Sequence, residues 1–320
     1  MRVATDVGGT FTDLVYFDEV TGRSGAVKVD TTPPDFERGV MDGLRKAGLD
    51  TSEIELFAHG TTVVINALTE RRGAKTGLVT TRGFRDVLEI ARGNRPDLYN
   101  FYFSKPKPFV PRYLRKEVDE RLDHKGEVLA PLDAESLEPV ADFFREEGVE
   151  AVAVCFVHSY ANPSHELKAA RVLEELLPGV SVVPAHHITR EWREYERTNT
   201  AVLSAYVHPA ANGYLDSLER KLDRDGFGGR LFVMQSNGGS ATVRAARSNP
   251  IAMVESGPVG GVLGAAALGK LIGEPNIMTL DIGGTTAKCS LVQDGEVRVD
   301  TEYKIERSRT NPGYPIQTPV

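Results

Sequence analysis

The chain has 320 residues, of which 41% are hydrophobic and 26% are charged, and this ordinary globular usage excludes general disorder. A length of this size predicts two domains. The 38 lysines and arginines against 45 aspartates and glutamates give a net charge of −7, and this balance argues against a nucleic-acid-binding protein.

The first thirty residues predict three strands, at 3–7, 11–17 and 26–29, and a helix follows Pro33-Pro34 over 35–47. Short strands and helices then alternate. They are predicted, in chain order, as strand 56–58, helix 61–72, strand 75–80, helix 84–92, an irregular stretch 93–113, helix 135–147, strand 149–157, helix 164–177 and strand 180–183. This order indicates an α/β protein in which helices layer a mixed sheet.

Residues 190–224 form the longest helical stretch, and we expect it to break near Pro209 and to cross between the two halves of the chain. A strand over 231–235 ends in Ser-Asn-Gly-Gly. A Gly/Ala-rich helix begins near Pro258, and another hairpin follows it.

The longest apolar run, Ala151 to Val157, is far shorter than the roughly 18 residues of a membrane span. Cys155 and Cys289 lie in apolar, strand-like contexts and are predicted to be buried thiols rather than a disulfide or a metal site. With no signal-peptide pattern at the start, these features predict a cytoplasmic protein.

One phrase occurs twice, as Asp-Val-Gly-Gly-Thr-Phe-Thr-Asp at 6–13 and as Asp-Ile-Gly-Gly-Thr-Thr-Ala-Lys at 281–288. Strand-like sequence flanks each copy, so each copy predicts a hairpin. Two consecutive glycines allow a tight turn whose outward N–H groups can hold a phosphate. The alternatives are a dinucleotide-binding loop, a Walker A loop at 264–270 that lacks its Ser/Thr, and two ordinary hairpins.

The two hairpins supply the predicted site. Asp6 and Asp281 lie at strand ends and are predicted to organise Mg²⁺, which favours oxygen ligands. Asp13 is a third candidate catalytic carboxylate, with a plain strand-edge role as its alternative. Lys288 occupies the matching position of the second hairpin, where it could reach phosphate or pair with an acid. The predicted phosphate contacts are Gly8, Gly9, Thr10, Thr12, Gly283, Gly284, Thr285 and Thr286.

Further polar motifs lie between the hairpins. His59, Thr61 and Thr62 precede a helix and are predicted as a second phosphate or substrate contact; the alternative is a helix cap with a buried histidine. The glycines of 257–261 permit close packing of a helix on a sheet. The turn at 236–239 is equally a ligand contact or a plain turn. The histidines show no metal spacing, so we expect no metal other than Mg²⁺.

Seven motifs in one order resemble the hydantoinase/oxoprolinase family of the actin-like ATPase superfamily. They are DVGGTFTD at 6–13, HGTTVVINAL at 59–68, LEIARGNRPDLYN at 88–100, ERLDHKGEVLAPLD at 120–133, QSNGG at 235–239, ESGPVGG at 255–261 and DIGGTTAK at 281–288. The resemblance implies RNase H-like domains that clasp ATP between paired phosphate hairpins. It also implies an N-terminal hydantoinase/oxoprolinase domain over 1–188 and the beginning of a second domain over 189–320.

The resemblance implies an ATP-dependent amidohydrolase of the hydantoinase or 5-oxoprolinase type, which phosphorylates a cyclic amide or imide carbonyl, or the ATP-binding subunit of one. A ketone carboxylase subunit, a simple kinase, and a fragment that acts only with a partner are the alternatives. Family chains continue past the segment resembling 313–320 into a glycine-rich adenosine-binding stretch. We therefore expect a fragment or a split chain that is completed by another segment or by a second hydantoinase-type subunit.

Overall fold

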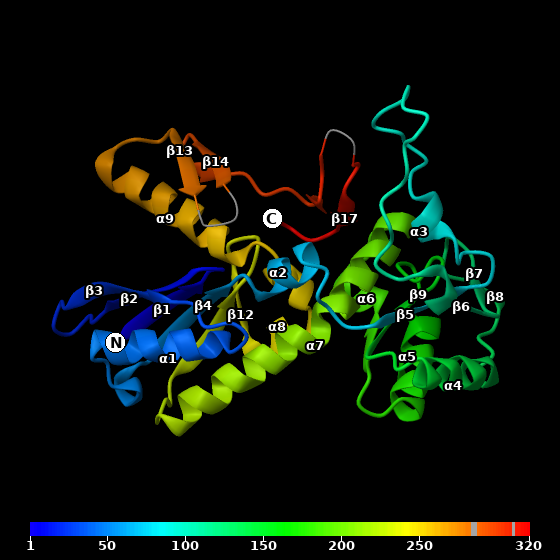
Figure 1. Cartoon of the computed structure of the whole chain (residues 1–320), viewed down its shortest axis with the longest axis horizontal. Coiled ribbons are helices and arrows are strands. Elements are labelled where there is room, and N and C mark those ends of the chain that lie inside the picture. Colours follow the sequence, from blue (N-terminus) through cyan, green and yellow to red (C-terminus); the bar gives the residue numbers. More distant parts are fainter. Residues whose placement is uncertain (283–286, 309–310) are drawn as a thin grey trace. The chain divides into compact units, whose positions relative to one another are not determined.

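The structure is a computed structural model that describes residues 1–282, 287–308 and 311–320, and it contains two units that each have their own sheet (Figure 1). The first unit comprises residues 1–66, 210–300 and 319–320, and the second comprises 67–209 and 301–318. Neither unit is a single stretch of chain, because two helices belong to both. The sequence division into 1–188 and 189–320 stays a prediction about the two family segments.

The first unit is built on a six-stranded mixed sheet in the order β12-β11-β4-β1-β2-β3. Strands β1, β2 and β3 are antiparallel, whereas β4 and β11 run parallel to β1. The elements of this sheet and its flanking helices are β1 Arg2–Val7, β2 Phe11–Phe17, β3 Ser24–Asp30, α1 Phe36–Ala47, β4 Leu56–Thr61, α2 Val63–Thr69, α7 Glu194–Arg224, β11 Arg230–Met234, β12 Ser240–Thr242 and α8 Val243–Ser248.

Alternation along β1 explains how this sheet is buried. Val3 and Val7 point into the core, where they meet α1 and the end of α7 through Leu44 and Leu218. Asp6 lies between them in the sequence pattern and is exposed. Helix α1 ends at Gly48, whose φ of 63° is the left-handed conformation that glycine adopts readily. The core therefore fixes β1 while its opposite face remains free to carry polar groups.

The rest of the first unit is a helix followed by a second hairpin. Helix α9 (Ser256–Ile272) packs against β13 (Ile277–Ile282), β14 (Ala287–Gln293) and β4, and β15 is Glu296–Val297. Strands β13 and β14 are antiparallel. The repeated phrase of the sequence thus gives two hairpins in one unit, β1–β2 and β13–β14.

The second unit contains a four-stranded sheet in the order β10-β9-β5-β6, with all strands parallel. The element bounds are β5 Thr76–Thr81, α3 Val87–Ile90, β6 Arg115–Val118, β7 Arg121–Leu122, β8 Val128–Ala130, α4 Glu138–Glu146, β9 Ala151–Cys155, α5 Ser164–Leu176, β10 Ser181–Pro184, α6 Ala185–Ile188, β16 Tyr303–Ile305 and β17 Tyr314–Ile316. Short 3₁₀ turns lie at Arg112–Leu114 and Glu135–Leu137 in this unit, and at Thr51–Glu53 and Pro250–Met253 in the first unit.

Three sequence expectations are corrected. Helix α7 runs through Pro209 without a break; buried Val207 before the proline and buried Leu215 after it hold the helix together despite the missing amide hydrogen. The helices expected at 61–72 and 84–92 shorten to α2 and α3. Cys155 is buried as expected, but Cys289 is exposed. No helix among the described residues is long and apolar enough to cross a membrane.

Candidate functional site

The first hairpin places two carboxylates side by side. Asp6 on β1 and Asp13 on β2 are direct cross-strand partners. The turn between the strands is closed by the Gly8 N–H, which donates to the Phe11 carbonyl over 2.9 Å. The Gly8 N–H is therefore already used within the turn, and the phosphate contact expected at Gly8 stays a prediction.

Thr31 braces the same turn from the end of β3. Its hydroxyl donates to the Gly8 carbonyl over 2.9 Å, and its N–H donates to the Thr10 carbonyl over 2.9 Å. Within the described residues, the N–H groups of Gly9 and Thr10 have no protein acceptor. The turn is thus held in shape by the protein while two of its N–H groups stay available.

The second hairpin repeats this register. Asp281 on β13 is the direct cross-strand partner of Lys288 on β14, just as Asp6 is the partner of Asp13. Lys288 therefore occupies the same register position in the second hairpin that Asp13 occupies in the first, as the sequence indicated. The predicted phosphate contacts Gly283, Gly284, Thr285 and Thr286 lie outside the described residues.

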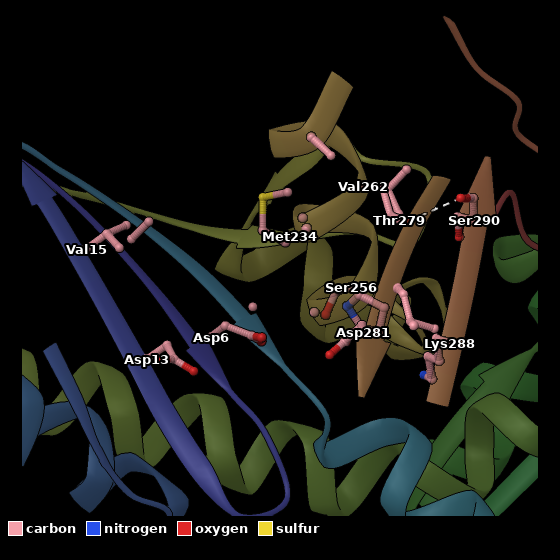
Figure 2. A pocket seen from close by; sticks show the side chains of 18 of the residues that line it. Asp6, Asp13, Val15, Met234, Ser256, Val262, Thr279, Asp281, Lys288 and Ser290 are labelled. Atoms are coloured by element: carbon pink, nitrogen blue, oxygen red, sulfur yellow. Dashed lines mark hydrogen bonds between the residues drawn. The ribbon is translucent and has the colours of Figure 1, made fainter. Parts of the chain in front are cut away.

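A pocket of about 710 Å³ lies between the two hairpins in the first unit, and this volume is typical of a ligand site. Asp6, Asp13, Asp281 and Lys288 all line it. Figure 2 shows Asp6 and Asp281 directed toward one another from strands of different hairpins. The rest of the lining includes the start of α9, the hydroxyl side chains of Thr5, Thr279 and Ser290, and apolar side chains, among them Val15, Met234, Val262, Ile277, Met278 and Leu280.

Two glycines create the space that the Asp6 carboxylate occupies. A Cβ at Gly257, in the first turn of α9, would lie 2.7 Å from Asp6 Oδ1. A Cβ at Gly60, in the neighbouring strand β4, would lie 3.2 Å from the same atom. The sequence marked Gly257 as a packing glycine and did not link it to the site, because only the fold brings α9 to the end of β1.

The surroundings of Asp6 disfavour its charged form. Burial raises the pKa of Asp6, and the carboxylates of Asp13 and Asp281 raise it as well. Lys28 and Lys288 lower the pKa by less, and the combined result is a pKa of about 6. Asp6 lines the pocket and keeps exposed surface, so exposure and incomplete solvation coexist at this side chain. Asp6 therefore titrates close to neutral pH.

Both lysines of the site are paired with acids. Lys28 Nζ lies 2.6 Å from Asp13 Oδ2, and both side chains are half exposed. Lys288 forms an ion pair with Glu255, a buried residue immediately before α9. Ser236, from the turn at 236–239, accepts a hydrogen bond from the Glu255 N–H over 3.0 Å. That turn therefore supports the start of α9, and none of residues 236–239 lines the pocket.

Seven predicted contacts do not line the pocket: Gly8, Gly9, Thr10, Thr12, His59, Thr61 and Thr62. His59 is fully buried, with Nδ1 2.8 Å from Thr5 Oγ1 and Nε2 2.7 Å from the Tyr214 hydroxyl. Burial lowers the His59 pKa to about 3, which keeps the imidazole neutral. Thr12 and Thr61 are also buried, and the hydroxyls of Thr12, Thr61 and Thr62 all have protein partners.

The described residues contain no group of three or more His, Cys, Asp or Glu side chains that could hold a metal ion. The pocket does carry oxygen donors whose mutual repulsion contributes to the raised pKa of Asp6. A cation beside Asp6 would relieve that repulsion, and Mg²⁺ accepts one or two carboxylates together with water and phosphate oxygens. The residues present therefore fit a magnesium ion that is shared with a nucleotide.

Paired hairpins around a pocket, on α/β units with mixed and parallel sheets, define the actin-like ATPase architecture. The chain belongs to the hydantoinase/oxoprolinase family. The family model for the hydantoinase/oxoprolinase N-terminal region matches residues 2–177, and the hydantoinase/oxoprolinase model matches residues 197–320.

Relatives of known activity fall into two reaction types. The chain is 33% identical to the caprolactamase alpha subunit of Pseudomonas jessenii over 96% of its length and 46% of that protein. It is 32% identical to the acetophenone carboxylase gamma subunit of Aromatoleum aromaticum, covering 92% and 42%. It is 30% identical to 5-oxoprolinase 1 of Arabidopsis thaliana, covering 100% and 27%. The chain thus spans half or less of the length of these relatives.

Solved structures agree with this assignment. The structure of the ATP-dependent caprolactamase from Pseudomonas jessenii superposes with a TM-score of 0.86 at 32% identity, covering all of this chain and 47% of that one. A nucleotide-free acetone carboxylase superposes with a TM-score of 0.85 at 26% identity and the same coverage. The fold is therefore that of the ATP-dependent members of the family.

Proposed function

We propose that this chain is the ATP-binding part of an enzyme that hydrolyses a cyclic amide or imide with hydrolysis of ATP. The observation that carries the proposal is the pairing of two hairpins of equal register, Asp6 with Asp13 and Asp281 with Lys288, around one pocket. The caprolactamase and 5-oxoprolinase relatives support the hydrolase reading.

In this proposal the chain positions the phosphates of ATP. The N–H groups of Gly9 and Thr10, which have no acceptor among the described residues, would donate to phosphate oxygens. Asp6 with Asp281 would hold Mg²⁺ directly or through water. Bound Mg²⁺ would neutralise phosphate charge during transfer. Lys288, held by Glu255, would keep a positive charge beside Asp281. Gly283, Gly284, Thr285 and Thr286 keep their predicted role as the matching phosphate contacts.

The chemistry explains why ATP is needed. The carbonyl of a cyclic amide is a poor electrophile, and phosphorylating its oxygen makes a good leaving group. Phosphoryl transfer is catalysed almost entirely by positioning and charge stabilisation, which is what the two hairpins would supply. A second subunit or a further segment would supply the rest of the nucleotide site and the hydrolytic step. Subunit designations in the names of two relatives support such a partner.

The proposal is tested by ADP release from the assembled enzyme with hydantoin, 5-oxoproline or caprolactam as substrate. We expect stimulation by at least one cyclic amide without bicarbonate, and no stable phosphorylated product. A stable phosphorylated metabolite would instead identify a simple kinase. Asp6→Ala should abolish ATP turnover and leave the protein folded.

A ketone carboxylase subunit is the second candidate, because the acetophenone carboxylase relative is as similar as the hydrolases. Phosphorylation of an enolate oxygen and of bicarbonate would use the same ATP clamp. ATP turnover that strictly requires bicarbonate, with acetophenone or acetone as co-substrate, would replace the hydrolase proposal by this one. If the assembled enzyme turned over no ATP with any of these substrates, the chain would be a binding partner only.

A further inference from the structure

The parallel sheet of the second unit has a point where its strand order reverses. The chain goes from β5 outward to β6 on one side, and from β9 outward to β10 on the other side. Strands β5 and β9 are therefore the neighbours at the reversal, and in open parallel sheets ligands bind at the carboxyl ends of such strands. Phe156, Val157 and His158 follow the carboxyl end of β9, and Thr81 ends β5.

Buried side chains hold the segment that leaves β9. The Phe156 N–H donates to Glu166 Oε1 over 2.9 Å, and Glu166 Oε2 lies 2.8 Å from His186 Nδ1. The Phe156 carbonyl accepts from Arg197 Nη2 over 2.9 Å. Glu166 and Arg197 are both almost completely buried. Burying charged groups is costly. The hydrogen bonds from Glu166 and Arg197 to the Phe156 backbone fix the position of this short loop.

A second carboxylate acts on the next residue. The Val157 N–H donates to Thr81 Oγ1 over 2.9 Å, and the Thr81 hydroxyl contacts the buried carboxylate of Glu120. Glu120 Oε2 in turn lies 2.7 Å from His165 Nδ1. Two carboxylate–imidazole pairs, Glu166 with His186 and Glu120 with His165, thus hold the residues at the end of β9. The next residue in the chain is His158.

His158 is the half-buried group that this framework presents. Its φ of 63° is the left-handed conformation, and its Nδ1 lies 3.3 Å from the Tyr160 hydroxyl. Ser159 is buried, and its hydroxyl has no partner among the described residues. The Arg197 Nε–H, beside the Tyr160 ring, also lacks a partner there. The loop therefore contains two buried hydrogen-bond donors that have no partner among the described residues.

The charge around His158 is mostly positive. Arg121, Arg197 and His124 act on the imidazole, and Asp123 is the opposing acid. Burial and the neighbouring basic groups lower the His158 pKa, which favours the neutral imidazole. Cations and donors of this kind match an oxyanion and would repel a metal ion.

We propose that the carboxyl edge of β5 and β9, centred on His158, binds the oxyanion of a small organic acid. A small molecule that bears a carboxylate would then bind this unit more tightly than a neutral lactam does. This inference rests on the proposed function only for the identity of the substrate class, because binding here needs no nucleotide.

The test is calorimetry on the 320-residue chain without nucleotide, using 5-oxoproline, caprolactam, bicarbonate and phosphate as separate probes. We expect 5-oxoproline to bind and caprolactam not to bind. His158→Asn should weaken binding about tenfold or more, since a charge-assisted hydrogen bond is lost, whereas the fold should persist because asparagine tolerates a positive φ. Arg121→Gln should weaken it similarly. His187→Gln, at an exposed histidine after β10, is the matched control and should leave the affinity unchanged.

Binding of bicarbonate that depends on His158, without binding of 5-oxoproline, would support the oxyanion site and make bicarbonate its source. Equal affinity for caprolactam, preference for phosphate, or an unchanged affinity in His158→Asn would overturn the inference. Failure of ATP turnover with oxyanion binding intact would overturn the proposed function alone.

Discussion

The carboxylate of Asp6 lies directly against the backbone of Gly257. A Cβ at residue 257 would approach Oδ1 to 2.7 Å and Cγ to 3.3 Å, which is closer than non-bonded atoms allow. Asp6 belongs to the first hairpin, whereas Gly257 belongs to the helix that leads to the second hairpin. The close approach of Asp6 and Gly257 therefore connects the first hairpin, at its candidate metal ligand, with the helix that precedes the second hairpin.

Gly257→Ala tests this contact. The new methyl group must displace the Asp6 carboxylate, and misplacing a catalytic group by about 1 Å can cost on the order of 100-fold in rate. We expect ATP turnover by the assembled enzyme to fall by about tenfold or more. Gly264→Ala on the same helix is the control, because a Cβ there meets no described atom within 4 Å. It should keep full turnover and stabilise the protein by about 0.5–1 kcal/mol.

Asp6→Asn should change stability in a pH-dependent way. The pKa of Asp6 is raised from 3.8 to about 6, so the folded state binds more protons than the unfolded state between these values. The charged form therefore destabilises the fold above about pH 6, and this penalty disappears as the pH falls toward 4. We expect Asp6→Asn to stabilise by about 1 kcal/mol at pH 7.5, after allowance for solvent in the pocket, and by little at pH 4.5.

Thermal unfolding at both pH values measures this effect, with Asp223→Asn as a control at an exposed carboxylate. An equal shift of Tm at pH 7.5 and pH 4.5 would show that Asp6 is not strained by its surroundings. Loss of ATP turnover together with a gain in stability would mark a group kept for function rather than for folding.

Local patterns predicted the hairpins well. Alternating apolar residues set β1 and β2, and the paired glycines set the turn, so Asp6 opposite Asp13 follows from the register alone. The sequence matched Lys288 with Asp13, and the register of the second hairpin places Lys288 opposite Asp281. These relationships span only a few residues, and neighbouring side chains decide them.

Contacts between distant segments were not predictable in the same way. Gly60 and Gly257 meet Asp6 only because β4 lies beside β1 and α9 packs on β4. His59 looked like a ligand because it precedes a helix, yet alternation along β4 turns it into the core toward Tyr214. The break expected at Pro209 failed because packing on both sides of the proline outweighs one lost hydrogen bond.

Gly9→Ala separates folding from phosphate binding. Gly9 does not have a positive φ, and a Cβ there meets no described atom within 4 Å, so stability should change by about 0.5 kcal/mol or less. If the turn holds phosphate, the methyl group should reduce ATP turnover by about tenfold or more. Gly22→Ala is the converse control: its φ of 71° should cost about 1 kcal/mol, measured by urea unfolding, with turnover unchanged. Full turnover in Gly9→Ala would remove this turn from the nucleotide site.

The buried pair of His59 and Tyr214 should make the protein sensitive to acid. Burial lowers the His59 pKa from 6.5 to about 3, so the unfolded state binds more protons than the folded state between these values. Stability is unaffected above pH 6.5 and falls as the pH drops through this window, by about 2–3 kcal/mol between pH 7 and pH 4.5. His59→Gln removes the titrating group, so the unfolding free energy of this variant should lose about 2–3 kcal/mol less than that of the wild type between pH 7 and pH 4.5. At pH 7 the unfolding free energy of the variant should be lower than that of the wild type, because the buried hydrogen bonds change. Urea unfolding at pH 7 and pH 4.5 gives both values, and His124→Gln, at an exposed histidine, should keep the wild-type slope. Parallel pH slopes for wild type and His59→Gln would show that His59 has the same pKa in the folded and unfolded states, and would contradict this prediction.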